Sequence, residues 1–284
     1  MSRIPLPERL IARAIHATVL VDRAYKLFDR TRSALVARLA PDGALARLND
    51  LAYNARTIYS SESSSFKPTL FNWEEEALAG WLPAPPARIL VGGAGGGREA
   101  FALCARGYDV VAFEPSASLA EGLSRPRPDG RVVAGYRARY EDLPWLAGVP
   151  GGPPGTRIDA LPRFQAALLG WASYSHIRTA GQRAAALRAV ADVTDGPILI
   201  SFYPAPAGTG RPPVGVRRWL DRIGLWSPTD RFTPFVGFYH LATPREIATE
   251  AEAAGLCLLH LSEDDSDGRW PYAVLARRDS QKLR

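Results

Sequence analysis

The chain has 284 residues, of which 46% are hydrophobic and 23% charged. This composition is typical of a globular protein with a packed core. It excludes an intrinsically disordered chain, which would be too polar to fold alone. No apolar run reaches the roughly 18 residues that a membrane-spanning helix needs, and the N-terminus lacks the features of a signal peptide. The two cysteines, Cys104 and Cys257, lie in apolar stretches and favour buried thiols over a metal site or a disulfide framework. We therefore expect a cytoplasmic protein without a bound metal.

The formal net charge of +6 comes from short clusters of arginine spread along the chain. A basic surface can attract nucleic acid, but no block of like charge here is long enough to form a nucleic-acid-binding arm. We expect no nucleic acid partner and no membrane contact.

Residues 1–84 form a predicted N-terminal helical extension or lid. Apolar residues recur at near-helical spacing from Leu10 to Phe28, and the helical pattern resumes over residues 44–59 after a Pro-Asp-Gly break. Tyr53, Arg56 and Tyr59 follow one another at intervals of three in this last segment. They could share a helix face that closes over a ligand, with Arg56 binding a carboxylate, or a face that packs on the core.

Residues 85–284 form the second predicted domain, in which short apolar strands alternate with helices. The predicted strands cover residues 88–91, 108–113, 131–135, 164–169, 198–202, 256–261 and 272–276. Such alternation with short turns predicts an α/β fold, a doubly wound and mostly parallel sheet with helices on both faces. Residues 203–239 interrupt it with many prolines and aromatic residues, which suits either a cap over a ligand or a separate small core.

A cluster of glycines, Gly92-Gly93-Ala94-Gly95-Gly96-Gly97, joins the first of these strands to a helix. Glycine lets the backbone turn sharply and approach a ligand, and the start of the following helix favours an anionic group. Glu114, followed by Pro115, ends the next strand, where a carboxylate can accept hydrogen bonds from ribose hydroxyls. The two features together predict a nucleoside ligand.

The spacing of the glycines distinguishes between nucleosides. A dinucleotide motif begun at Gly93 would require glycine at position 98, where Arg98 stands, and this disfavours a nicotinamide oxidoreductase. The pattern G-x-G-x-G over residues 93–97 resembles the first motif of class I S-adenosylmethionine-dependent methyltransferases. Segments after the third, fourth and fifth strands resemble the same family in the right order. The resemblance implies a seven-stranded Rossmann-like sheet, S-adenosyl-L-methionine as cofactor and a small-molecule acceptor.

The resemblance also assigns residues to the cofactor. Glu141 and Asp142 match a loop that meets the adenine, and Gly170 and Trp171 match the loop that faces the transferred methyl group. With the glycine turn and the candidates named above, the cofactor set is Gly92, Gly93, Ala94, Gly95, Gly97, Arg98, Glu114, Pro115, Glu141, Asp142, Gly170, Trp171, Tyr53, Arg56 and Tyr59.

Two positions depart from the family pattern. Val91 stands where an acidic residue is usual before the glycines, and Gln165 stands where aspartate often opens the fourth strand. A catalytically inactive scaffold that binds the cofactor therefore remains an alternative. Methylation of nucleic acid is disfavoured, because the Asn/Asp-Pro-Pro-aromatic motif that holds an exocyclic amine does not follow the fourth strand.

Histidine is the natural base near neutral pH, and methyl transfer needs a base where the acceptor must lose a proton. His176, in the loop after the fourth strand, and His240, at the end of the aromatic insert, are the candidate catalytic residues. Tyr174 and Tyr239, close to them in sequence, are the candidate substrate contacts. The sequence leaves open the acceptor, the atom methylated and the oligomeric state.

Overall fold

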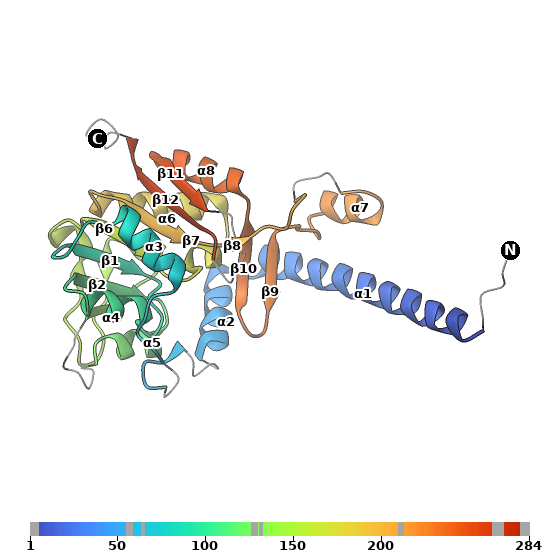
Figure 1. Ribbon diagram of the computed structural model, residues 1–284, viewed down its shortest axis with the longest axis horizontal. Helices are drawn as coiled ribbons and strands as arrows, with labels where there is room; N and C mark the ends of the chain where they lie inside the picture. Colours follow the sequence, from blue (N-terminus) through green and yellow to red (C-terminus); the bar gives the residue numbers. More distant parts are fainter. Residues whose placement is uncertain are drawn as a thin grey trace.

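A computed structural model describes residues 6–54, 59–63, 66–125, 130, 133–209, 213–262 and 270–278. Its centre is a seven-stranded sheet in the order β11-β12-β7-β6-β1-β2-β3, with β12 antiparallel to both neighbours and the other pairs parallel (Figure 1). The strands are β1 Arg88–Gly92, β2 Asp109–Glu114, β3 Ala134–Arg137, β6 Ala166–Leu169, β7 Ile198–Ser201, β11 Leu256–Ser262 and β12 Tyr272–Arg277. The predicted doubly wound α/β fold is confirmed.

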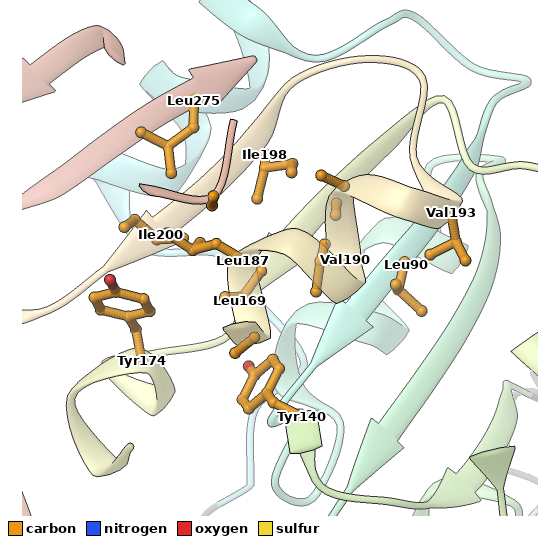
Figure 2. Close-up of a cluster of buried hydrophobic side chains, with 14 of the residues drawn as sticks. Leu90, Tyr140, Leu169, Tyr174, Leu187, Val190, Val193, Ile198, Ile200 and Leu275 are labelled. Atoms are coloured by element: carbon orange, nitrogen blue, oxygen red, sulfur yellow. The ribbon is translucent and has the colours of Figure 1, made fainter. Parts of the chain in front are cut away.

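Helices cover both faces of this sheet because the strand residues alternate in direction. Leu90 of β1 packs with α6 Ala180–Val193 and α8 Pro244–Ala253, as Figure 2 shows for α6. Its neighbours Ile89 and Val91 pack on the opposite face. The helices whose residues join that second cluster are α3 Asn72–Trp81, α4 Arg98–Cys104 and α5 Ala117–Leu123. Near-continuous burial of the strands is what a parallel sheet covered on both sides requires.

A short insertion leaves the sheet between β3 and β6. β4 Trp145–Leu146 and β5 Thr156–Arg157 form a small antiparallel hairpin. Short 3₁₀ turns, η2 Tyr140–Asp142, η3 Ile158–Ala160 and η4 Ser173–His176, complete the connections before and after β6.

The predicted boundaries differ from the structure at two places that matter. β3 begins at Ala134, three residues after the start of the predicted strand. Residues 131 and 132 of that prediction lie outside the described part. The predicted helix over residues 44–59 corresponds to α2 Asp42–Asn54, and Tyr59 belongs to a separate short turn. Tyr53 and Tyr59 therefore do not share a described helix, although their rings lie 5.0 Å apart.

The N-terminal helix α1, Leu6–Leu39, projects far from the body of the molecule (Figure 1). Only its C-terminal part packs on the body: Ser33 is buried and its hydroxyl accepts a hydrogen bond from the amide of Phe232. None of the helices in the described part is long and apolar enough to cross a membrane.

Residues 203–239 build a small sheet instead of a loop. β8 Tyr203–Pro204 and β9 Asp230–Thr233 flank β10 Gly237–Ala242, and α7 Val216–Arg222 precedes β9. β9 packs on α1 and β10 packs on α2. The side-chain amide oxygen of Asn49 on α2 accepts a hydrogen bond from the amide of Phe238 on β10 (2.8 Å). Residues 203–239 thus contain a small sheet, and their role as a cap stays a prediction.

Candidate active site

A cavity of about 470 Å³ opens at the carboxyl ends of β1, β2, β3 and β6. In a parallel sheet this edge collects the loops that follow the strands, and ligands of doubly wound folds bind there. The glycine turn, the residues after β2 and β3, and the loop after β6 line one part of the wall. Further parts of the wall come from α2 and from Tyr59, Phe66, Lys67, Thr69 and Phe71. No described residue of 203–239 lines the cavity.

The glycine turn fits closely against its neighbours. Gly93 has φ +62°, a conformation that L side chains rarely adopt, and a Cβ there would lie 2.4 Å from the Cβ of Ser173. A Cβ on Gly96 would lie 2.0 Å from the carbonyl oxygen of Tyr59. Glycine is therefore required at both positions, and the turn brings Ser173 and Tyr59 to the same cavity.

Glu114, at the carboxyl end of β2, lines the cavity and is 7% exposed. Its Oε2 accepts a hydrogen bond from the amide of Gly95 (2.8 Å), and its Oε1 accepts one from the amide of Ser116 (2.9 Å). Each carboxylate oxygen keeps a second lone pair with which it can accept a hydroxyl group. Burial raises the pKa of Glu114 to about 7, against the lowering effect of the two backbone hydrogen bonds.

Arg98 lines the cavity but is held by acidic neighbours. Its guanidinium contacts Glu74 (2.6 Å) and Glu99 (2.7 Å), and it donates a hydrogen bond to the carbonyl oxygen of Thr69 (2.8 Å). Burial opposes the positive charge, but Glu99 and Glu74 outweigh it and raise the pKa of Arg98. Arg98 thus ties the segment before α3 to α4. The other arginine predicted for a carboxylate, Arg56, lies outside the described residues.

His176 and Tyr53 form a hydrogen-bonded pair in the cavity wall. The Nδ1 of His176 lies 2.6 Å from the carbonyl oxygen of Phe238, and its Nε2 lies 2.5 Å from the hydroxyl of Tyr53. Since a carbonyl only accepts, Nδ1 carries the proton and Nε2 accepts from the tyrosine. Burial lowers the pKa of His176 to about 4, so the imidazole is neutral at neutral pH.

The structure places the other predicted residues in two groups. Those in the cavity wall, besides the residues already described, are Ala94, Pro115, Glu141 and Trp171. Those outside the wall are Gly92, Gly97, Asp142, Gly170, Tyr174, Tyr239 and His240. Gly170 supports the glycine turn, since its amide donates to the carbonyl oxygen of Gly92 (2.7 Å), and Asp142 accepts from the amide of Arg139 (3.2 Å).

Tyr174 and Tyr239 are not placed to contact a substrate in this cavity. The Tyr174 ring is fully buried, and its hydroxyl donates to Glu250 of α8. Tyr239 packs on Tyr203, with ring centroids 4.8 Å apart. Both side chains come from elements beside the cavity but contact the core or the small sheet.

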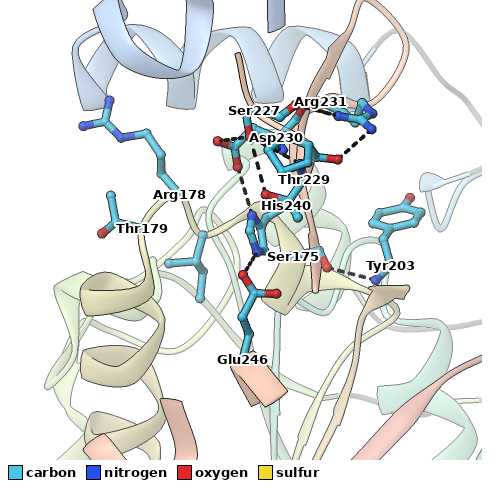
Figure 3. A network of polar contacts seen from close by, with 12 residues as sticks. Ser175, Arg178, Thr179, Tyr203, Ser227, Thr229, Asp230, Arg231, His240 and Glu246 are labelled. Carbon is cyan, nitrogen blue, oxygen red and sulfur yellow. Dashed lines mark hydrogen bonds and ion pairs between the residues drawn. The ribbon is translucent and has the colours of Figure 1, made fainter. Parts of the chain in front are cut away.

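His240 does not face the cavity either. It is 5% exposed on β10, with Nδ1 at 2.9 Å from Asp230 and Nε2 at 3.6 Å from Glu246 (Figure 3). Burial opposes its protonation, but the hydrogen bond to Asp230, the contact with Glu246 and the charge of Asp230 outweigh it and raise the pKa of His240. The prediction of His240 as the catalytic base is thus wrong for this cavity, because its two acidic partners hold it between β9 and α8.

Several residues of the wall were missed by the sequence analysis. Glu99 is buried, and its Oε1 accepts from the amide of Trp171 (3.2 Å) as well as from Arg98. Tyr140 and Ser173 share a hydrogen bond of 2.8 Å in the cavity wall. Position supplied a signal for two of them: Glu99 lies two positions after the last glycine of the cluster, and Tyr140 precedes the predicted Glu141-Asp142 pair.

Asp50 on α2 is a further wall residue that the sequence analysis missed. Partial burial raises the pKa of its carboxyl group, while Arg139 and Arg137 act in the opposite direction. The described residues contain no group of three or more His, Cys, Asp or Glu side chains placed to hold a metal ion.

The fold resembles solved methyltransferase structures. The CcbJ methyltransferase from Streptomyces caelestis is 18% identical over 80% of this chain and 98% of that chain, with a TM-score of 0.54. The mitomycin 7-O-methyltransferase MmcR is 15% identical over 89% of this chain and 68% of that chain, with a TM-score of 0.52. At these identities the likeness shows the fold alone, a Rossmann-like methyltransferase fold. No protein-family model matches the chain, and no curated protein sequence does.

Proposed function

We propose that this protein is an S-adenosylmethionine-dependent methyltransferase that acts on a small-molecule acceptor. The observation that carries the proposal is the position of Glu114 in the cavity wall, hydrogen-bonded to the amide of Gly95 in the glycine turn. A buried carboxylate beside a close-packed glycine turn suits a ribose, and the spacing G-x-G-x-G rather than G-x-G-x-x-G favours the sulfonium cofactor. The methyltransferase fold agrees with this choice.

The residues present fit the cofactor in chemistry. We assign the ribose hydroxyls to Glu114 and the adenine to the wall beyond β3, where Tyr140 and Glu141 lie. When bound, S-adenosylmethionine supplies an electrophilic methyl group on a positively charged sulfur.

Tyr53 and His176 are the residues that we assign to the acceptor. The Tyr53 hydroxyl donates to Nε2 of the neutral imidazole, so its oxygen can in turn accept a hydrogen bond from an acceptor. The low pKa makes His176 a weak base. This arrangement suits positioning of an acceptor that loses its proton easily, and α2 and the segment around residues 59–71 act as the lid over it.

The two departures from the family pattern are accommodated in the fold. Val91 is fully buried on the sheet face away from α6, and the side-chain oxygen of Gln165 accepts from the amide of Arg88 (2.9 Å). Neither side chain lines the cavity. A non-catalytic scaffold remains as the outcome to be tested, and the cytoplasmic location inferred from cysteine usage stays a prediction.

Calorimetry with S-adenosylmethionine, S-adenosylhomocysteine and NAD tests the cofactor. We expect the first two to bind with micromolar dissociation constants and NAD not to bind. Binding of NAD alone would contradict the proposal. With binding established, transfer is tested by a screen of phenols, amines and sugars that follows the formation of S-adenosylhomocysteine. If none of these acceptors is methylated, the result favours the scaffold.

A further inference from the structure

The outer half of α1 exposes a row of large apolar side chains to solvent. Among the described residues, this half of the helix projects beyond the body, which contacts α1 further along at Ser33 and Ala34 (Figure 1). The large exposed side chains are Leu10 (57%), Ile11 (60%), Ile15 (58%), Val19 (42%), Leu20 (64%), Val21 (69%), Tyr25 (65%) and Phe28 (65%). Contiguous exposure on this scale marks an interaction surface.

The spacing along this half indicates a second helix as the partner. One line of apolar residues advances alternately by four and three positions, through Leu10, Ala14, Ala17, Val21, Ala24 and Phe28. A repeat of 3.5 residues is the seam of a pair of supercoiled helices. The charged residues Arg13, Asp22, Arg23 and Lys26 all lie off this seam.

The seam is also complementary to itself when reversed. If two copies run antiparallel about Val19, Leu10 meets the partner copy's Phe28, Ala14 meets Ala24, and Ala17 meets Val21. Large side chains then meet at the two ends and small ones in the middle, so that the helices can approach evenly. Leu20 lies on one side of the seam and next to the two-fold axis. The Leu20 side chains of the two copies therefore face each other across this axis. A symmetric, self-complementary patch is what a two-fold dimer requires.

We propose that α1 is a dimerisation helix that pairs antiparallel with α1 of a second copy of this chain. Six of these side chains lie on or next to the seam: Leu10, Ile11, Leu20, Val21, Tyr25 and Phe28. Each is about three-fifths exposed, and together they bring on the order of 600 Å² per protomer to the contact, or about 1,200 Å² in all. This area reaches the lower end of specific, stable interfaces. The seam contains no charged residue, so no charge is buried in the pair.

The pairing would also reach the cavity through the chain. α1 leads directly into α2, whose Asn49 and Tyr53 lie at β10 and in the cavity wall. Pairing of α1 would hold the start of α2 and so the lid side of the proposed active site.

The oligomeric state of the full chain tests the proposal, by sedimentation equilibrium between 1 and 100 µM. We expect twice the chain mass for the wild type. Leu20→Glu and Leu20→Lys each place like charges opposite one another, and we expect each to weaken dimerisation at least 100-fold. An equimolar mixture of the two should dimerise again, because Leu20 faces its own copy only in the antiparallel register.

Val19→Glu is the matched control. Val19 lies almost opposite Val21 around the helix and is 42% exposed, so its substitution should leave the dimer intact. Circular dichroism of each variant checks that α1 stays helical. A monomeric wild type, equal loss in Val19→Glu, or failure of the mixture to pair would overturn the proposal. Binding of a monomeric wild type to anionic phosphatidylglycerol vesicles would instead assign the surface to a membrane.

Discussion

The carboxyl group of Glu114 is removed from water by burial, and this favours binding of a ligand that can donate hydrogen bonds to it. The pKa of Glu114 is about 7, so the carboxyl group loses its proton near neutral pH. The ionised form accepts hydroxyl hydrogen bonds more strongly than the neutral form. A ligand with two adjacent hydroxyl groups would therefore replace water as the partner of the buried charge.

Glu114→Gln should weaken binding of S-adenosylhomocysteine about 10-fold or more at pH 8, since hydrogen bonds to a charged group contribute roughly 1.5–3 kcal/mol. For the wild type, affinity should fall as the pH drops from 8 to 6, because Glu114 takes up a proton; in the variant this dependence should be lost. Calorimetry across this range measures both. Asp109→Asn, at the exposed start of the same strand, is the control and should bind as the wild type does.

His176 gives a second prediction at this scale. The imidazole is neutral with its proton on Nδ1, because it donates to the Phe238 carbonyl and burial lowers its pKa to about 4. Its ring ¹⁵N resonances, assigned by comparison with His176→Gln, should show this tautomer unchanged between pH 5 and 8. In Tyr53→Phe the tautomer should persist while the Nε2 resonance shifts. A titration midpoint near 6.5 would contradict the burial described here.

At the scale of elements, a buried ion pair joins the two helices on one face of the sheet. Arg183 of α6 and Glu250 of α8 have side chains only 3% and 4% exposed and lie 2.6 Å apart. The hydroxyl of Tyr174 on η4 donates to the same carboxylate. Because the three groups satisfy one another, their burial is tolerated in an otherwise apolar cluster.

Glu250→Ala should lower the free energy of unfolding by about 3–5 kcal/mol, since it leaves the Arg183 guanidinium buried without its partner. Urea denaturation followed by circular dichroism measures the loss. Glu252→Ala, two residues along α8, removes an exposed pair with Arg278 and should change stability by less than about 1 kcal/mol. Equal losses in the two variants would show that burial of the pair has no bearing on stability.

At the scale of the whole molecule, His240 connects the small sheet to the large domain. It lies on β10, with Asp230 of β9 on one side and Glu246 of α8 on the other (Figure 3). Burial would raise the pKa of Glu246, but the contact with His240 and the hydrogen bonds from Thr243 prevail and lower it to about 2. The charged histidine therefore stabilises the contact between the two parts.

The raised pKa of His240 determines the sign of a pH effect. Its stabilisation is complete below about pH 6.5, the value for an unperturbed histidine, and is lost as the pH rises through the raised value. The difference in free energy of unfolding between wild type and His240→Asn should thus be larger at pH 6 than at pH 9, by about 1–2 kcal/mol. Urea titrations at the two values measure it. His16→Asn, exposed on α1, is the control, and a difference that grows with pH would refute the assignment.

The sequence by itself determined the features that depend on neighbouring residues. The glycine turn, Glu114 at the end of the next strand and the alternation of strands and helices could all be predicted, because each is a local pattern with a fixed period or spacing. The mostly parallel character of the sheet followed, since parallel strands need crossover connections and place their loops at one edge.

Only the tertiary structure decided which side chains share the cavity and which do not. Tyr53 and His176 are 123 positions apart in the sequence and meet because α2 packs on β10. Asn49 of α2 accepts a hydrogen bond from the amide of Phe238, and the carbonyl oxygen of Phe238 orients the imidazole. His240, by contrast, lies outside the cavity wall, between two acidic partners that no local sequence pattern predicts. Contacts between distant segments depend on how whole elements pack, and packing depends on the shapes of many side chains at once, which a local spacing does not contain.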